Sequence, residues 1–477
     1  MESTPSPRYK WVALSIVTTG AFMVAIDSTV VIIALPDIIS DLHASLLAAV
    51  WVIMSYIFIS TVLLLALGRV ADIYGRVRLY NLGFIVFTVG SALCGLSPGA
   101  WELVAARVIQ GGGGALMLVN SWAIVTETFP PNQRGLALGI NSLTFGVGGI
   151  VGPVLGGFIL AIASWRWVFL INIPIGIAVT ILAYRYLRQR PPAPGPCDTL
   201  DLVGTVLFTL SLLALLVALM GGIQVGYGTA WVIALFVGAG VGMLLFYLWQ
   251  RHVACPALDL RLFANRGFDF AVLAATLQAL GIFAVQFLIV FYLQAVRGYS
   301  PLHAAVLLLP MPIALAVVGP LSGRLSDRIG ARLPATAGLL IQAFGIWWLS
   351  RTTAHSSYLQ LAVGLALAGI GGGLFFSPNT SAVMGSAPPE RLGVASAVLA
   401  TLRNTGMVTS YALSLAVAAA SIPREIMLRL FVATEAHLGT ALAGAFVHGM
   451  RAALHVSAGI CVAAALMSLV RGPERRR

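Results

Sequence analysis

Two ionisable residues lie inside long apolar stretches of the sequence, Asp27 within residues 11–35 and Arg107 within residues 101–124. A charge at the centre of a bilayer costs at least ~2.5–3.5 kcal/mol on insertion scales, so such a residue indicates a function. At a rise of about 1.5 Å per residue, each would lie about 10 Å from the same membrane surface. A neighbouring arginine favours the ionised carboxylate, whereas burial favours the neutral acid. The two residues are therefore a candidate proton-binding site; a static pair that neutralises itself is the alternative.

Two further carboxylates, Glu127 and Asp269, lie near the ends of apolar stretches. Either could be a second titrating group, but a side chain at the membrane surface can also reach water, so a structural role is equally open. Aromatic rings and carboxamides without net charge suit a pocket for large, flat, apolar molecules, and simple packing is the alternative. The candidates for this substrate cavity are Gln110, Gln278, Phe283, Gln286, Phe287 and Tyr292.

The composition predicts that these residues lie in a membrane protein. Hydrophobic residues make up 59% of the 477 positions and charged residues only 9%, whereas a soluble domain has roughly 25% charged residues. Counting apolar stretches gives fourteen, many of which reach the ~20 residues that a membrane-crossing helix needs. The sequence therefore predicts a polytopic, all-helical membrane protein and excludes an ordinary soluble enzyme.

The net charge of +12 indicates orientation in the membrane rather than nucleic-acid binding. With the N-terminus inside, most of the 28 Lys and Arg residues fall in inner loops, as the positive-inside rule requires. Both termini are therefore expected in the cytoplasm, with the chain in the cell membrane. The four cysteines show no CxxC spacing, so neither a structural disulfide nor a metal site is expected.

A repeated motif divides the chain into two halves. Residues 68–76 (GRVADIYGR) and 323–331 (GRLSDRIGA) share the frame G-R-x-[AS]-D-x-x-G. Between them, residues 188–200 contain four prolines in six positions, which predicts a stiff, non-helical connector. The expected organisation is an N-terminal six-helix half over 1–187, a connector with an inserted helix pair over 188–268, and a C-terminal six-helix half over 269–477.

The repeated motif places carboxylates and guanidinium groups at the inner ends of helices. Charge pairs and helix-end contacts there could hold a gate closed and release it when the halves move. Marking of topology by arginine is the alternative, but it explains neither the carboxylates nor the glycines at fixed spacing. The gate candidates are Gly68, Asp72, Gly75, Arg76, Asp327 and Arg328.

A glycine motif lies in the fifth apolar stretch. Gly148, Gly152 and Gly156 recur every fourth residue and therefore line one face of a helix. Small residues on such a face let another helix approach closely, and Pro153 weakens the hydrogen-bond ladder and allows a bend. Gly157 completes the motif.

Five motifs occur in a fixed order on the expected helices. They are DSTVVIIALP at 27–36, the loop motif at 68–76, LxxxRxxQG at 103–111, the glycine motif at 148–157 and WRWVFLINIPIG at 165–176. Together they resemble the fourteen-spanner drug:proton antiporters of the major facilitator superfamily, over the whole chain. The sequence departs from the family pattern at Ile32, where asparagine is usual, and at Ile73, where arginine is usual.

The resemblance implies a major facilitator fold with fourteen transmembrane helices as 6 + 2 + 6, its two six-helix halves related by a parallel repeat. It also implies a proton-coupled antiporter, not an enzyme, that exports hydrophobic, cationic drugs or toxic compounds by alternating access. Asp27 and Arg107 would act in proton coupling, and the glycine motif would limit leak.

The partners that the resemblance implies are a small hydrophobic substrate, protons and membrane lipids. No cofactor, metal or nucleic acid is expected, and a monomer would suffice. Export of an endogenous lipid or secondary metabolite is the alternative function. A membrane-embedded enzyme is disfavoured, because the sequence shows no converging catalytic cluster.

Overall fold

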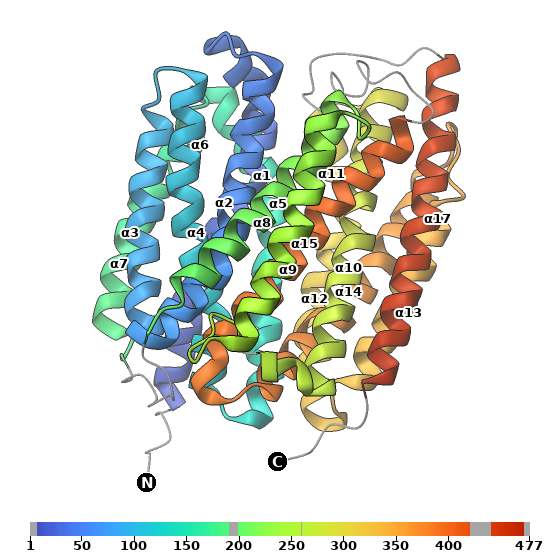
Figure 1. Cartoon of the computed structure of the whole chain (residues 1–477). Helices are drawn as coiled ribbons and strands as arrows, with labels where there is room; N and C mark the ends of the chain where they lie inside the picture. The colour runs from blue at the N-terminus through green and yellow to red at the C-terminus, as the bar shows by residue number, and fades with distance from the viewer. Residues whose placement is uncertain (1–6, 190–198, 259, 420–439, 472–477) are drawn as a thin grey trace. The chain divides into compact units, whose positions relative to one another are not determined.

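The computed structural model describes residues 7–189, 199–258, 260–419 and 440–471. Every regular element within these ranges is a helix (Figure 1), which confirms the all-α prediction. Ten of the described helices are long and apolar enough to cross a membrane. Their length and composition are those of an integral membrane protein, and the count of fourteen spans stays a prediction.

The helices form two compact units, which are described separately. The first comprises residues 1–200, 319–331 and 376–401, and the second comprises residues 201–318, 332–375 and 402–477. The first unit therefore contains the predicted N-terminal half together with two short segments of the C-terminal half. The predicted inserted helix pair belongs to the second unit.

In the first unit, α1, α2, α3, α4 and α7 surround one buried region. Helix α4 packs against α2 and α3, while α1 packs against α4, α5 and α7 (blue to teal in Figure 1). The candidate site lies among these helices. The elements of this part are α1 (Pro7–Asp41), α2 (Leu46–Tyr74), α3 (Arg76–Gly95), α4 (Ala100–Thr128), η1 (Pro131–Gln133), α5 (Arg134–Ile162), α6 (Trp167–Leu170) and α7 (Asn172–Tyr186).

The second unit has its own apolar core. Helices α10 and α13 pack against α17, around buried side chains that include Leu288, Ile346 and Phe446. Its elements are α8 (Leu202–Val225), α9 (Ala230–His252), η2 (Leu260–Ala264), α10 (Arg266–Phe291), η3 (Tyr292–Val296), α11 (Pro301–Leu307), α13 (Arg332–Leu349) and α17 (Thr440–Val470). Helices α12 (Pro310–Ile329), α14 (Tyr358–Ser386) and α15 (Leu392–Ala419) are divided between the two units, and η4 (Pro389–Arg391) belongs to the first.

The last glycine of each repeated motif ends a helix. Gly75 follows α2 with φ 98°, and Gly330 follows α12 with φ 89°. The Gly75 N–H bonds the Ala71 carbonyl, and the Gly330 N–H bonds the Ser326 carbonyl. Residues with a Cβ rarely adopt such positive φ values. The turn that ends each helix therefore requires glycine at the last position of the G-R-x-[AS]-D-x-x-G frame.

One carboxylate joins the two helices of the inserted pair. Asp201 accepts hydrogen bonds from the Gly204 N–H in the first turn of α8 at 2.8 Å, from Trp249 Nε1 at 2.9 Å and from Gln250 Nε2 at 2.7 Å. It therefore caps the N-terminus of α8 and at the same time fixes the C-terminal end of α9.

The expectation that the chain has no structural disulfide is wrong. Cys255 is disulfide-bonded, whereas Cys94 and Cys461 are free and buried. Sequence spacing does not reveal such a bond, because a disulfide depends on the distance between two Cα atoms in the folded chain. Most of the predicted connector over 188–200 lies outside the described residues.

Candidate functional site

Asp27 on α1 lies in a buried polar network of the first unit. Its side chain is fully buried, and its Oδ2 is 2.6 Å from Arg107 Nη1 on α4. Its Oδ1 accepts hydrogen bonds from Gln110 Nε2 at 2.8 Å and from Asn172 Nδ2 at 3.3 Å. The two charges predicted to meet are therefore in direct contact, and α1, α4 and α7 all supply partners to one carboxylate.

Arg107 has partners besides the carboxylate. Only 1% of the residue is exposed, and its Nε donates to the Val52 carbonyl at 3.1 Å. Its Nη1 donates to Gln110 Oε1 at 2.6 Å, and its guanidinium carbon lies 4.3 Å from the centroid of the Tyr56 ring. A buried charge is stable only when it is paired and hydrogen-bonded. This arginine meets the requirement with an anion, two carbonyl oxygens and an aromatic face.

The network extends to residues that sequence reasoning did not assign to it. Gln110 was predicted as a cavity residue, but its carboxamide bridges the ion pair, and its Nε2 also donates to Ser91 Oγ on α3 at 2.8 Å. Asn172, the first residue of α7, is 3% exposed. It lies in the WRWVFLINIPIG motif, so a signal was present, but nothing in that motif alone points to Asp27.

The glycine motif sets α1 against α5. A Cβ atom built on Gly148 would lie 2.5 Å from Ala25 Cβ, and one on Gly152 would overlap Thr29. The Thr29 hydroxyl also reaches the Gly148 carbonyl at 3.4 Å. Small residues on this face therefore allow the contact that holds the helix of Asp27, whereas a role in limiting leak stays a prediction.

At one end of the unit, Asp72 on α2 caps the N-terminus of α15. Its carboxylate accepts hydrogen bonds from the backbone N–H groups of Gly393 at 2.9 Å and Val394 at 3.0 Å. Arg76, one turn further, donates to Asp72 at 2.6 Å and forms an ion pair with Glu127 on α4. A carboxylate at a helix N-terminus is favoured by the helix dipole and by charge-assisted hydrogen bonds. Glu127 thus lies in the predicted gate, away from Asp27.

Asp327 makes the same kind of contact in the second copy of the motif. Its carboxylate accepts from the backbone N–H groups of Gly135 at 2.9 Å and Leu136 at 3.1 Å, in the first turn of α5. Burial raises the pKa of Asp327, although the two amide hydrogen bonds act in the opposite direction. Arg328, predicted as part of this gate, is exposed in the last turn of α12.

Pairs of glycines bring the backbones together at both caps. A Cβ atom on Gly68 would lie 2.7 Å from the Gly393 carbonyl oxygen, and one on Gly135 would lie 2.5 Å from the Gly323 carbonyl oxygen. Real Cβ atoms do not approach so closely, so each cap needs glycine on both sides. This close approach explains why the repeated motif begins with glycine, whereas the turn explains only why the motif ends with one.

Sequence reasoning missed Gly135 and Gly393. The available signal was a second repeat, PPNQRG at 130–135 and PPERLG at 388–393. In both copies the second proline begins a short 3₁₀ helix, η1 or η4, and the glycine enters the following α-helix. The two repeats are complementary, because each carboxylate motif contacts the proline–glycine motif of the other half.

The predicted cavity residues of the second unit lie in or against its packed interior. Gln278 Nε2 donates to Gln342 Oε1 at 3.1 Å, and Tyr292 donates to the Thr353 carbonyl at 2.8 Å. Phe283 packs against the apolar core. These contacts account for the burial of the side chains, and their role in substrate binding stays a prediction.

The remaining predicted site residues lie outside the contacts described above. Asp269 lies in the first turn of α10, where the helix dipole favours a carboxylate, so both interpretations of it remain open. Gly157 is half-buried on α5. The side chains that lie outside the described set are those of Pro153, Gln286 and Phe287.

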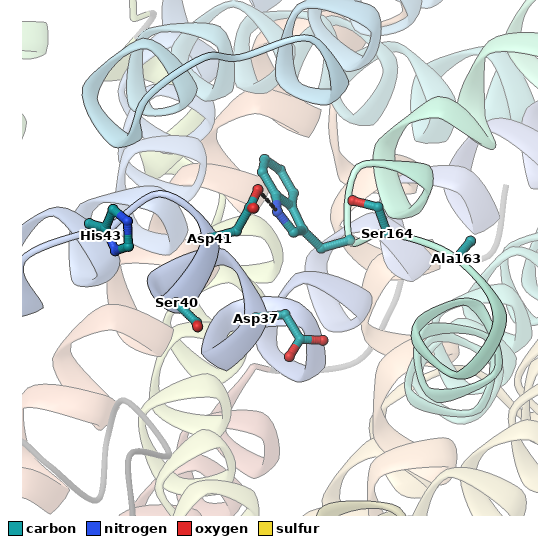
Figure 2. Close-up of a pocket in the computed structure, with 7 residues that line it drawn as sticks. Asp37, Ser40, Asp41, His43, Ala163 and Ser164 are labelled. Atoms are coloured by element: carbon teal, nitrogen blue, oxygen red, sulfur yellow. Dashed lines mark hydrogen bonds between the residues drawn. The ribbon is translucent and has the colours of Figure 1, made fainter.

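The C-terminal end of α1 carries an open pocket of ≈ 440 Å³. Asp41 accepts hydrogen bonds there from Trp165 Nε1 at 2.9 Å and from Arg166 Nη1 at 2.6 Å, and Figure 2 shows the indole reaching the carboxylate. These bonds, that of Trp165 foremost, hold the pKa of Asp41 below its ordinary range. The contact ties the end of α1 to the connection between α5 and α6. The pocket is lined by Asp37, Ser40, Asp41, His43, Ala163, Ser164 and Trp165.

Comparison with known proteins gives one consistent result. Residues 17–411 match the family model described as Major Facilitator Superfamily. The chain is 32% identical over 399 residues to the riboflavin transporter RibZ of Clostridioides difficile (strain 630), covering 83% of this chain and 86% of that protein. It is 35% identical over 402 residues to the multidrug resistance protein Stp of Mycobacterium tuberculosis (strain CDC 1551 / Oshkosh), covering 84% and 74%.

A solved structure is similar in fold. The human organic anion transporter MFSD10 matches with a TM-score of 0.67, covering 97% of this chain and 100% of that chain at 14% sequence identity. At this identity the likeness concerns the fold alone.

Proposed function

Because the chain belongs to the major facilitator superfamily, whose members are transporters and not enzymes, we propose that it is a proton-coupled antiporter. It exports hydrophobic compounds, cationic drugs and toxic compounds among them, by alternating access. The observation that carries the proposal is the Asp27–Arg107 ion pair, whose partners are 0% and 1% exposed. A buried ionisable pair of this kind is costly in a membrane and is kept where a charge must change.

Protonation of Asp27 is the step that couples the proton to movement. The ionised carboxylate holds Arg107 and Gln110 on α4 and Asn172 on α7. A proton entering from the acidic side cancels its charge and weakens these contacts together, because hydrogen bonds to a charged group are roughly twice as strong as neutral ones. Loss of the proton to the other side restores them. The packing of α1 against α4 and α7 therefore depends on whether Asp27 carries the proton.

The caps formed by Asp72 and Asp327 act as the gate at the cytoplasmic end. Each contact consists of two short hydrogen bonds to a helix N-terminus. Such a contact is either made or broken by a small displacement, which suits a two-state gate. In this proposal the caps hold while the site faces outward and separate when it opens to the cytoplasm.

The substrate is a large apolar molecule. The relative named as a multidrug resistance protein supports export of drugs. The relative named as a riboflavin transporter favours a second candidate, a flat endogenous metabolite handled by the same scaffold. Neutral flavins and lipophilic cations tested side by side distinguish the two.

Both termini lie in the cytoplasm in this proposal. Reporter fusions test the orientation: a fluorescent protein joined after Arg477 should fluoresce, whereas alkaline phosphatase at the same position should be inactive. The opposite pattern would reverse the orientation and with it the assignment of the caps to the cytoplasmic end.

The decisive experiment uses inverted membrane vesicles with an imposed pH gradient and ethidium as the probe. The parental protein should move ethidium into vesicles with an acidic lumen. Asp27→Asn keeps the shape but cannot titrate, so gradient-driven uptake should collapse while downhill movement survives. Asp27→Glu restores a titrating group and should recover part of the coupling with a shifted pH optimum. Parental gradient-driven uptake by the Asn variant would contradict the proposal.

A further inference from the structure

Protonation of Asp27 removes the negative charge that pairs with Arg107. The guanidinium keeps its positive charge, and removing one partner of a buried ion pair is strongly unfavourable. The partners that do not titrate with Asp27 are the Val52 carbonyl, the Gln110 carboxamide and the rings of Tyr56 and Phe169. The Tyr56 ring is the nearer of the two aromatic rings, at 4.3 Å against 5.8 Å from ring centroid to guanidinium carbon.

The effect of the Tyr56 ring follows from its quadrupole. The face of an aromatic ring is negative, so it attracts the guanidinium and repels a carboxylate. With Asp27 ionised, the two contributions partly cancel. With Asp27 protonated, the attraction of the ring for Arg107 remains alone. The ring therefore stabilises the protonated state of the site more than the ionised state.

Two glycines on α4, Gly111 and Gly114, allow the Tyr56 ring to reach this position. A Cβ atom on Gly111 would lie 2.8 Å from the Tyr56 carbonyl oxygen, and one on Gly114 would lie 2.7 Å from the Tyr56 hydroxyl. Helix α2 can therefore approach α4 only because these positions lack side chains. The Tyr56 hydroxyl is buried and has no hydrogen-bond partner among the described residues, so the contact with Arg107 depends on the ring and not on the hydroxyl.

We propose that Tyr56 is a positioning residue for proton coupling, whose ring holds the Arg107 charge while Asp27 is protonated. This inference rests on the proposed function, because it requires Asp27 to bind the transported proton. Gly111 and Gly114 then have a function of their own, since they allow the ring to lie over the guanidinium.

The titratable groups that the structure places around Asp27 are few. Arg107 on α4 is the direct partner, while Tyr56 on α2 and Cys94 on α3 interact electrostatically with both members of the pair. Tyr56 and Cys94 are neutral at physiological pH. A change in the pH dependence of transport in this region therefore reports on Asp27 and on how well the charge of Arg107 is accommodated.

Two substitutions of Tyr56 test the proposal in inverted vesicles with ethidium, by measuring the initial rate of uptake against lumenal pH. Tyr56→Phe keeps the ring and should keep the parental midpoint. Tyr56→Leu removes the ring, so a lower pH is needed to protonate Asp27, and the midpoint should fall by about 1 pH unit while downhill transport persists. An unchanged midpoint in the Leu variant, or an equal shift in the Phe variant, would overturn the proposal.

A second pair of variants covers the case in which the Leu variant does not fold. Gly114→Ala introduces a methyl group 2.7 Å from the Tyr56 hydroxyl, which pushes the ring away from Arg107 and should also lower the midpoint. Combining it with Tyr56→Phe removes the overlapping atom and should restore the midpoint. A shift that the double variant does not reverse would assign Gly114 to helix packing and contradict the proposal.

The Asp27 and Tyr56 variants together distinguish a failure of this proposal from a failure of the proposed function. If Asp27→Asn abolishes coupling but both Tyr56 variants behave as the parent, Asp27 is the proton site and the Tyr56 ring does not contribute to coupling. If Asp27→Asn couples normally, the proposed function itself is wrong.

Discussion

Asp72 and Asp327 occupy the same position in two copies of one motif, and each caps the first turn of a helix from the opposite half. The hydrogen bonds are closely matched, at 2.9 and 3.0 Å for Asp72 and 2.9 and 3.1 Å for Asp327. Asp72 also forms an ion pair with Arg76, whereas the described residues show no ion pair for Asp327. The gate is therefore symmetric in its backbone contacts and asymmetric in its charge.

The asymmetry predicts unequal effects of neutralising the two carboxylates. Asp72→Asn loses the ion pair and the charge-assisted bonds, which are worth about 1.5–3 kcal/mol, so transport should fall by about tenfold or more. Asp327→Asn, the matched control, should have the same direction and a smaller effect. Abundance in the membrane should stay near parental for both, because no core packing is lost. Parental ethidium transport by Asp72→Asn would show that the loop only marks topology.

Asn172 offers a way to raise the proton affinity of the site. Its Nδ2 lies 3.3 Å from Asp27 Oδ1, so Asn172→Asp would place two carboxylates in contact. Like charges at this distance cannot both ionise easily, and the pH midpoint of ethidium uptake should move upward by about 1 unit or more. Asn172→Ala removes a hydrogen bond to the ionised carboxylate without adding a charge, so it should move the midpoint upward by a smaller amount than Asn172→Asp. A downward shift in the Asp variant would contradict the placement of α7 beside Asp27.

The contact between Asp41 and Trp165 should be independent of pH in the physiological range. The pKa of Asp41 is lowered by hydrogen bonds from Trp165 and Arg166, so the contact is complete above the unfolded value of 3.8 and is lost only as pH falls through the lower, folded value. The fluorescence difference between the parent and Trp165→Phe measures it. That difference should be flat from about pH 5 to 8 and change only at more acidic pH.

The matched control for this measurement is Asp41→Asn, which cannot titrate and should give a flat difference throughout. An inflection between pH 5 and 8 that this variant abolishes would show that Asp41 is not held in its ionised form.

Asp201 should be necessary for the stability of the inserted helix pair. Asp201→Ala leaves the donors of Trp249 and Gln250 without their acceptor; the cost is about 1–3 kcal/mol for the buried Gln250 amide and smaller for the exposed Trp249 indole. The thermal unfolding temperature in detergent should fall clearly. Asp201→Asn retains one acceptor oxygen and should be milder. Equal unfolding temperatures for the parent and the Ala variant would mean that α8 and α9 associate without this contact.

The sequence predicts single residues of the site better than it predicts their neighbours. Asp27 and Arg107 stand out because a charge in an apolar stretch is rare, and their equal depth on two helices is enough to propose the contact. Asn172 and Tyr56 do not stand out, since an amide or a tyrosine in an apolar helix has many ordinary roles. Their function depends on which helices are adjacent, and periodicity along one helix carries no such information.

The gate shows a similar limit. The repeat of Asp72 and Asp327 is visible because carboxylates are scarce in this chain, whereas Gly135 and Gly393 are two glycines among 50. The disulfide at Cys255 was missed although cysteine is scarce, because pairing is set by distances in the folded chain. Scarcity makes a residue conspicuous in a sequence, and a common residue becomes meaningful only when its neighbours in space are known.

The hydrogen-bond donors of both caps are main-chain N–H groups, so most substitutions of the side chains at these positions leave the donors in place. A missense mutation at Leu136 or Val394 alters a side chain but leaves the N–H group that Asp327 or Asp72 binds, unless it introduces proline. The gate is therefore robust to drift at Leu136 and Val394 and vulnerable at the two carboxylates and at the glycines that admit them, two of which, Gly135 and Gly393, are themselves capped. Such an arrangement lets the helices beside the gate diverge freely without loss of closure.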